Sequence, residues 1–499
     1  MNPLYYIDFY KVGHVQQYPT DTEQVWSNWT PRSSRVEGQN TVVLFGLQYF
    51  MQKYLIERFT KEFFSRPIKE ILGEYNRIIS ATLGISKPVT RHIEQLHEMG
   101  YLPIRIYAIP EGFSTPLNVP HLVVTNTVDH AYWVPNYLET LMSSVLWKPS
   151  TSATTAQRYR KLFIKYAHEA GEEDLGFVDW MGHDFSFRGM SSPEDAILSG
   201  MGHLLSFSGT DTIPAILAAH TYYGAEFGCG GSVPATEHSV MSAGTQEGEL
   251  ETMHRLLTEV YPSGILSIVS DTWDLWKVLT EFVPKLRKVI ASRKGKLVIR
   301  PDSGDPARIL CGDPGFEFAS HRYTGLNLKH HPAYYGTLRL LAQALGVDDK
   351  RHGLPLIQGA GAIYGDSISY ERADDILGKT VRELKLSPYN LVFGIGSFTY
   401  EYVTRDTYGF AMKATAVRRK GKVIDIFKSP ITDFGGKVSH RGIPAVYRSE
   451  ESTEERPEYF VVQGATDEQL RNCALDLVFE DGAMKKYSTF QEIRKRARA

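Results

Sequence analysis

The sequence predicts an α/β protein whose central part, residues 176–400, forms a (β/α) barrel. Short apolar runs follow one another through this range, each run ends in a polar, glycine-rich turn, and helix-like segments separate the runs. Alternating strands and helices are typical of βαβ units in a parallel sheet. So many units in succession favour a closed barrel over an open sheet. In such barrels the turns that follow the strands form the active site.

The predicted barrel strands end in turns that carry charged and polar side chains. In chain order these turns lie at residues 184–189, 209–212, 237–238, 270–274, 300–304, 358–367 and 394–397. Polar residues therefore fall where a barrel places its chemistry.

The first part of the chain, residues 1–175, mixes helices and strands. Residues 102–127 contain extended runs broken by proline and glycine, which is typical of short antiparallel strands. Residues 151–171 predict a helix that starts with threonine and serine and ends at Gly171.

The last part of the chain, residues 401–499, is predicted to be rich in β-structure. Residues 408–430 predict two strands joined by a turn at Lys420–Gly421, and residues 489–499 predict a basic helix. Four basic residues lie near the predicted hairpin: Arg405, Lys413, Lys428 and Lys437. Such charges usually form a solvated face, but their position near glycine turns also indicates a small polyanionic ligand.

The composition narrows the class of protein. The chain has 499 residues, enough for two or three domains, and a formal net charge of −2, so no basic field indicates nucleic acid. Its three cysteines, Cys229, Cys311 and Cys473, are few and far apart, which argues against disulfides or a zinc site and fits a reducing cytoplasm. We see neither a signal peptide nor an apolar run long enough to cross a membrane.

The run "KLVIRPDSGDP" (296–306) ends in a charged turn. Arg300 and Asp302 flank Pro301, and alternate residues of an extended segment point the same way, so both charges can face one pocket. An arginine fork suits phosphate, and a carboxylate accepts hydrogen bonds from sugar hydroxyls. The alternative is a structural ion pair that closes the end of the barrel.

Other turns offer weaker candidates, each with an ordinary alternative. Asp211 follows a glycine turn, where it could equally cap a helix. His238 lies beside a glutamate, but a single histidine is more often a core or surface residue. The turn at 394–397 has backbone N–H groups that could hold a phosphate. Asp366 lies in a similar turn, although the glycine turn at 358–361 competes with it.

The motifs together resemble the nicotinamide phosphoribosyltransferase family in its bacterial and phage form. The similar pieces keep the family order: "DFYKVGHVQQYP", "FGLQYF", "PEGF", "HDFSFRGMSS", "FSGTDT", "SVPATEHS", "VSDTWD", "IRPDSGDP", "YGDS", "FGIGS", "TRDT" and "FKSP". The segment 305–353 matches poorly, so we expect it to be an insertion at the surface. The resemblance implies a type II phosphoribosyltransferase fold, a barrel with a β-rich domain built from both chain ends.

The resemblance also implies the reaction. Family members join nicotinamide to 5-phosphoribosyl-1-pyrophosphate, which yields nicotinamide mononucleotide and pyrophosphate in NAD salvage. They act as homodimers with active sites at the subunit interface. The alternative is a nicotinate phosphoribosyltransferase of the same fold. A binding protein that keeps the fold, or another barrel enzyme of phosphorylated sugars, is a weaker hypothesis.

For the base, the resemblance implies an aromatic sandwich. Phe185 and Tyr10, the latter from the other subunit, would stack on the pyridine ring. Asp211 would accept a hydrogen bond from the carboxamide and repel a carboxylate, which makes it the specificity residue. Two arginines, Arg188 and Arg300, would line the same pocket.

For the sugar and phosphates, the resemblance implies a polar set. Asp302 and Asp366 would hold the ribose hydroxyls, with Gly365 nearby. The 5-phosphate would bind at Gly394, Gly396 and Ser397. Pyrophosphate or ATP phosphates would meet Arg32, Arg405, Lys413 and Lys428, with Lys437 a further candidate. Mg²⁺ would be held mainly by pyrophosphate oxygens, with one or two carboxylates and no dedicated protein site.

The resemblance implies that ATP phosphorylates His238 and that hydrolysis is coupled to product formation. Ser232, Ser270 and Asp274 fall in matching positions near this histidine. The expected catalytic residues are therefore His238, Arg300 and Asp302. No protein nucleophile attacks the sugar, because the pyridine nitrogen does so; the protein supplies positioning and electrostatics.

Overall fold

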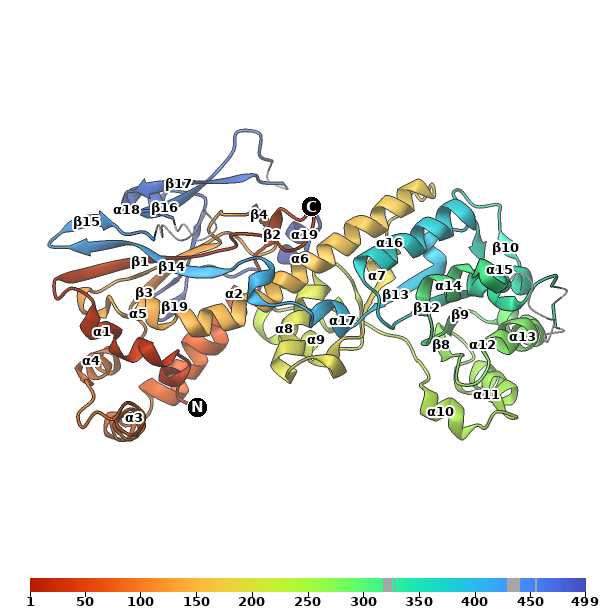
Figure 1. Cartoon of the computed structure of the whole chain (residues 1–499), viewed down its shortest axis with the longest axis horizontal. Helices are drawn as coiled ribbons and strands as arrows, with labels where there is room; N and C mark the ends of the chain where they lie inside the picture. Colours follow the sequence, from red (N-terminus) through yellow and green to blue (C-terminus); the bar gives the residue numbers. More distant parts are fainter. Residues whose placement is uncertain (317–324, 327, 429–439, 454–455) are drawn as a thin grey trace. The chain divides into compact units, whose positions relative to one another are not determined.

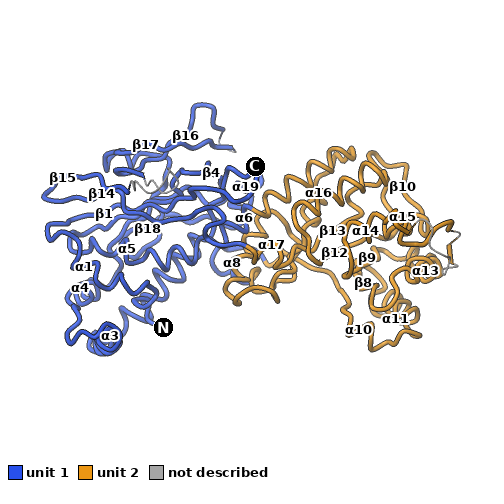
Figure 2. Tube along the Cα trace, in the orientation of Figure 1, with its two compact units in different colours: residues 1–154, 217–226, 403–499 blue, residues 155–216, 227–402 orange. Residues whose placement is uncertain are grey.

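The computed structural model describes residues 1–316, 325–326, 328–428, 440–453 and 456–499, so Lys437 lies outside the described residues. The chain forms two compact units (Figure 2). Unit 1 contains residues 1–154, 217–226 and 403–499, and unit 2 contains residues 155–216 and 227–402. From the sequence, domain boundaries are expected after residues 175 and 400. Both chain ends fold within unit 1.

Unit 2 is built on a parallel sheet, which confirms the predicted barrel. In the described residues its six strands follow the order β7 (Gly209–Thr210), β6 (Gly182–Asp184), β13 (Leu391–Ile395), β12 (Ala360–Tyr364), β9 (Leu297–Arg300) and β8 (Leu266–Val269). Every neighbouring pair is parallel.

The segment 231–236 joins the two edges of this sheet. Thr210 N donates to Gly231 O over 2.9 Å at the β7 edge, and Ser267 N donates to Pro234 O over 2.9 Å at the β8 edge. The segment carries the "SVPAT" part of the motif that contains His238. Its backbone therefore acts as an irregular further strand that closes the ring.

Each strand of this sheet has one face toward the hydrophobic core and one face toward the inside of the ring. On β9, Leu297 and Ile299 are fully buried in the hydrophobic core, which also contains Leu286 of α13 (Val283–Ser292). Val298 and Arg300 instead line a cavity inside the ring. Because side chains alternate along a strand, one set packs against the surrounding helices and the other set faces the lumen. Figure 1 shows the strands of this sheet with α13 and α15 beside them.

Part of the range 305–353 belongs to the barrel, which corrects the expectation of a surface insertion. It contains α14 (Pro306–Cys311) and α15 (Pro332–Leu345), which connect β9 to β12. Leu338, Leu340 and Leu341 of α15 are fully buried in the same core as the strands. These helices supply the crossover that two parallel neighbouring strands require.

Unit 1 contains an antiparallel sheet built from both chain ends. Its seven described strands follow the order β15 (Lys422–Asp425), β14 (Ala411–Arg419), β1 (Thr22–Thr30), β5 (Leu122–Asn126), β3 (Ile104–Ala108), β18 (Asp476–Glu480) and β19 (Ala483–Met484). The predicted hairpin is confirmed: β14 pairs with β15, and Lys420 and Gly421 have φ values of 48° and 71°. Both φ values suit a type I′ turn.

Three further segments that the sequence predicted are present in the structure, one of them with different bounds. The antiparallel strands expected in 102–127 are present, since β3 pairs with β5. The basic C-terminal helix is α19 (Phe490–Arg498). The helix expected at 151–171 is longer: α6 runs from Glu139 to Glu169 and includes Pro149. No helix in the described part of the chain has the length and apolarity that a membrane crossing requires.

A buried carboxylate organises the start of one helix in unit 1. Glu111 is buried, and its Oε1 accepts hydrogen bonds from Gly46 N (2.6 Å) and Leu47 N (2.9 Å), while Oε2 accepts from Gln48 N (3.0 Å). These amides begin α2 (Leu47–Phe50), whose first N–H groups have no partner within the helix. The carboxylate therefore replaces the missing helical acceptors.

We predict that Glu111→Gln lowers the free energy of unfolding by about 1–3 kcal/mol, the cost of leaving a buried donor without an acceptor. An amide has one acceptor oxygen, so whichever way it turns, at least one of the three N–H groups faces an NH₂ group. Thermal unfolding of the purified variant should show a lower midpoint.

The matched control is Glu98→Gln, because the Glu98 side chain is 65% exposed. We expect its midpoint to equal that of the parent protein. Equal midpoints for Glu111→Gln and the parent would contradict the role of the carboxylate.

Candidate active site

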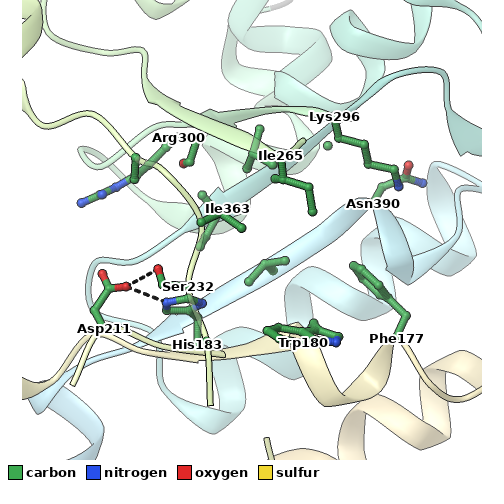
Figure 3. A pocket seen from close by; sticks show the side chains of 18 of the residues that line it. Phe177, Trp180, His183, Asp211, Ser232, Ile265, Lys296, Arg300, Ile363 and Asn390 are labelled. Atoms are coloured by element: carbon green, nitrogen blue, oxygen red, sulfur yellow. Dashed lines mark hydrogen bonds and ion pairs between the residues drawn. The ribbon is translucent and has the colours of Figure 1, made fainter. Parts of the chain in front are cut away.

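Two cavities of unit 2 meet at the carboxyl ends of the barrel strands. The inner cavity, about 360 Å³, lies in the lumen and is lined largely by apolar side chains (Figure 3). The outer cleft, about 800 Å³, lies over the strand ends and is more polar. Phe185, Asp211 and Arg300 line both. A flat apolar group with one polar substituent fits this junction, while a charged group fits the outer cleft.

Asp211 is held at the junction by two donors, as Figure 3 shows. Its Oδ1 accepts from His183 Nε2 over 2.9 Å and from Ser232 Oγ over 2.6 Å. Burial raises the pKa of Asp211, but the His183 and Ser232 hydrogen bonds and the charge of Arg300 outweigh it, so the pKa lies below its usual value. The carboxylate is therefore a fixed anion and not a helix cap.

Phe185 lies where two strand ends leave room for its ring. A Cβ added to Gly365 would lie 2.8 Å from the Phe185 ring, and one added to Gly394 would lie 2.3 Å from it. Both glycines are therefore needed for the ring to lie against the sheet. The guanidinium carbon of Arg300 lies 5.3 Å from the ring centroid, within cation–π range.

Arg300, Asp302 and His238 come together at the outer cleft. An Arg300 Nη2 and an Asp302 Oδ2 are 3.9 Å apart, and His238 Nε2 lies 4.0 Å from the same Asp302 oxygen. His238 is the first residue of α10 (His238–Ala243), and its Nδ1 lies 3.1 Å from Thr272 Oγ1. The side chain of His238 is 49% exposed, so its ring is open to a ligand.

Asp271 is the acid in the 270–274 turn that faces His238. Its Oδ1 lies 3.9 Å from His238 Nε2, and its Oδ2 accepts from Asp302 N over 2.8 Å. The two expected residues beside it serve the fold. Ser270 donates to Ile268 O, and Asp274 caps α12 (Leu275–Lys277) by accepting from two amides.

Most of the remaining barrel residues that the sequence singled out line the outer cleft. Five expected residues are among its lining: Arg188, Gly365, Asp366, Gly396 and Ser397. Gly396 is the N-cap of α17 (Ser397–Tyr400). Gly394 lies within β13, under the Phe185 ring. Carboxylates and backbone from several strand ends therefore converge on one cleft.

Unit 1 carries the other expected residues. Tyr10, in the short helix η2 (Phe9–Gly13), is 62% exposed. Arg32, Arg405 and Lys413 form a cation cluster. Burial and the charge of Arg405 lower the pKa of Arg32. Burial lowers the pKa of Lys413, and Arg32 and Arg405 lower it further, against the opposing effect of Glu139. Lys428 is exposed in the segment that follows β15.

Two carboxylates near His238, those of Asp271 and Asp302, could contribute ligands to a divalent cation. No group of three or more His, Cys, Asp or Glu side chains in the described ranges is arranged to hold a metal ion by itself. Asp271 Oδ1, however, is buried and has no hydrogen-bond partner, and Asp302 lies beside it. An oxygen of this kind suits Mg²⁺ when phosphate oxygens complete the coordination.

Sequence reasoning missed two residues of this site, His183 and Asp271. Both lie inside motifs that were singled out, "HDFSFRG" and "VSDTWD". The alternation of side chains along a strand offered a signal for His183, since it places His183 and Phe185 on the same face. Asp271 had no such signal, because a turn does not show which of its acids faces the cleft.

Comparisons with known proteins agree with this geometry. Residues 181–482 match the nicotinate phosphoribosyltransferase (NAPRTase) family, and residues 2–106 match the nicotinamide phosphoribosyltransferase N-terminal domain. The chain belongs to the nicotinate phosphoribosyltransferase family. The first match covers the whole cleft and the second covers Tyr10 and Arg32.

Relatives of this family member cover most or nearly all of the chain. A nicotinamide phosphoribosyltransferase of Acinetobacter baylyi is 45% identical over 99% of this chain and 97% of its own. One of Mycoplasma pneumoniae is 32% identical over 88% of this chain and 96% of its own. A crystal structure of a nicotinate-nucleotide pyrophosphorylase from Pyrococcus furiosus has a TM-score of 0.55 at 16% identity, covering 98% of this chain and 93% of that one. This likeness shows the fold.

We predict that Gly394→Ala destabilises the protein by about 1–3 kcal/mol, the usual cost of overpacking. The new Cβ would also lie 2.6 Å from the Cα of Gly365, so neither the ring nor the backbone can give way freely. Thermal unfolding should show a lower midpoint than the parent.

The control is Gly73→Ala in α3 (Ile68–Leu83), where a Cβ meets nothing within 4 Å. Alanine favours a helix over glycine by about 1 kcal/mol, so this midpoint should stay or rise. A Gly394→Ala midpoint equal to the parent's would show that the ring does not need the glycine.

Proposed function

We propose that this protein is a nicotinamide phosphoribosyltransferase of NAD salvage. It joins the ring nitrogen of nicotinamide to the sugar of 5-phosphoribosyl-1-pyrophosphate and releases pyrophosphate. The observation that carries the proposal is the junction of an apolar lumen with a polar cleft at Phe185, Asp211 and Arg300. The names of the relatives from Acinetobacter and Mycoplasma support it.

Asp211 selects the amide in this proposal. Among the described residues, both donors to Asp211 bond its Oδ1, which leaves Oδ2 to accept from the carboxamide NH₂ group. A nicotinate carboxylate has no such donor, and it would meet an anion whose pKa is held low. Phe185 supplies one face of the aromatic stack.

A second candidate is nicotinate phosphoribosyl transfer on the same site. The observation that favours it is Arg300, whose guanidinium lies beside the Phe185 ring and could pair with a carboxylate. Asp211 lies at the same junction and opposes it. Assays with both bases decide between them.

Transfer of the sugar needs positioning and charge. As the bond to pyrophosphate breaks, positive charge develops on the ribose, and the carboxylates of Asp302 and Asp366 stabilise it while they hold the hydroxyl groups. Asp271 and Asp302 would hold Mg²⁺ together with pyrophosphate oxygens. The metal, when bound, neutralises the leaving group.

The cation cluster of unit 1 would bind the pyrophosphate or ATP phosphates. Burial and then the charge of Arg405 lower the pKa of Arg32, and burial together with the charges of Arg32 and Arg405 lowers the pKa of Lys413. A bound polyanion would offset this repulsion between like charges. We propose a homodimer in which Tyr10 of the partner subunit completes the base stack. We also propose that the protein works in the cytoplasm, where its three cysteines, all of them described and none in a disulfide bond, would stay reduced.

His238 is the proposed acceptor of phosphate from ATP. A ring nitrogen attacks the γ-phosphorus, the bond to the bridging oxygen breaks, and ADP leaves. The exposed ring, flanked by Thr272, Asp271 and Asp302, supports this role. Hydrolysis of the phosphohistidine would then drive product formation.

The proposal is tested by incubating purified protein with the ribosyl donor, Mg²⁺ and either base. We expect mononucleotide from nicotinamide at a higher kcat/KM than from nicotinate. Absence of product from nicotinamide would refute the function. For Asp211→Asn we expect the ratio of the two kcat/KM values to fall at least tenfold, because a charge-assisted hydrogen bond is lost. An unchanged ratio would remove Asp211 from amide selection.

For the ATP step, we expect acid-labile phosphate on the protein after incubation with γ-labelled ATP and none on His238→Ala. The matched control is His220→Ala, whose ring Nδ1 bonds Ala225 O in unit 1. It should label like the parent. Equal labelling of His238→Ala and the parent would contradict the assignment.

A further inference from the structure

A second aspartate, Asp184, lies directly beneath the junction. It ends β6 and is fully buried. Its Oδ1 accepts from Ser186 N over 2.9 Å and from Ser186 Oγ over 2.6 Å, and its Oδ2 accepts from Thr212 Oγ1 over 2.7 Å. Asp184 is among the residues that line the outer cleft, but its side chain is fully buried and both of its oxygens are engaged by Ser186 and Thr212.

These bonds join two different loops. Ser186 belongs to the loop after β6, directly beside Phe185, whereas Thr212 belongs to the loop after β7, directly beside Asp211. The backbone adds to the connection, because Asp211 N donates to Asp184 O over 3.0 Å. Asp184 thus connects the loops that carry Phe185 and Asp211. In the proposed function, Phe185 would stack on the base and Asp211 would accept a hydrogen bond from its amide.

The surroundings of Asp184 make these bonds strong. Thr212 and Ser186 are fully buried as well. Gly200 of α8 (Pro193–Leu204) lies so close that an added Cβ would be 3.2 Å from Asp184 Oδ2 and 3.3 Å from Thr212 Cγ2. The helix backbone therefore covers the carboxylate and keeps water out. Hydrogen bonds to a charged group are stronger in such an environment.

We propose that Asp184 and Thr212 form a positioning pair that sets the placement of Asp211 relative to Phe185, and through it the preference for amide over acid. The inference rests on the proposed function. It assigns part of the selectivity to a fully buried hydroxyl that donates to Asp184. A displacement of the Asp211 loop would weaken the amide hydrogen bond while leaving the sugar and phosphate residues on other strand ends in place.

The test compares Thr212→Val with Thr212→Ser. Valine has nearly the shape of threonine but no hydroxyl, and serine restores the hydroxyl. We expect Thr212→Val to raise KM for nicotinamide roughly tenfold, the loss that one charge-assisted hydrogen bond would cause. The ratio of kcat/KM for nicotinamide over nicotinate should fall with it. KM for the ribosyl donor should stay within about twofold, and Thr212→Ser should resemble the parent.

The control for losing any buried hydroxyl is Thr380→Val. Thr380 is fully buried in unit 2, and its Oγ1 donates to Ile376 O over 2.8 Å, away from both cavities. A purely structural role of Thr212 predicts that both valine variants lose thermal stability and keep the base preference, which would overturn the inference. Ser186→Ala serves as a second variant and should shift the preference in the same direction.

The activity of the parent protein distinguishes a failure of this inference from a failure of the proposed function. A parent that makes product from neither base overturns both. A parent that works on nicotinamide, together with a Thr212→Val variant whose preference equals that of Thr380→Val, overturns the positioning pair alone.

Discussion

Alternation of side chains along the parallel strands decides where the functional groups of unit 2 lie. On β9 the odd positions, Leu297 and Ile299, pack against the helices, so Lys296, Val298 and Arg300 must face the lumen. Neighbouring strands add side chains to the same lumen. The cavity and the convergence of charges at its open end follow from this single geometric constraint and from the closure of the ring by residues 231–236.

Glycines in the barrel strands and in the turns after them leave the space that a ligand site needs. Barrel interiors are commonly filled by bulky side chains, but here Gly361, Gly365 and Gly394 leave space in the lumen and under Phe185. The aromatic ring takes that space and becomes the wall between lumen and cleft. A site for a flat base therefore depends as much on missing side chains as on those present.

The two units carry groups of site residues with opposite charge. The barrel carries the anions Asp211, Asp271 and Asp302, which suit an amide, a cation and sugar hydroxyls. Unit 1 carries the cluster of Arg32, Arg405 and Lys413, which suits phosphates. In the proposed reaction the amide-bearing base suits the first group, and the pyrophosphate of the other substrate suits the second. Each group alone would fit many ligands.

The sequence by itself determined the barrel, the order of its strand-ending turns, the hairpin at Lys420–Gly421 and the family, because these depend on local periodicity, turn chemistry and ordered motifs. It also singled out Asp211, Arg300 and Asp302, which line the outer cleft. Only the tertiary structure decided that Asp271 faces His238 while Asp274 caps a helix, and that α15, in the range 305–353, is core. These depend on contacts between segments far apart in the chain, which no local pattern records.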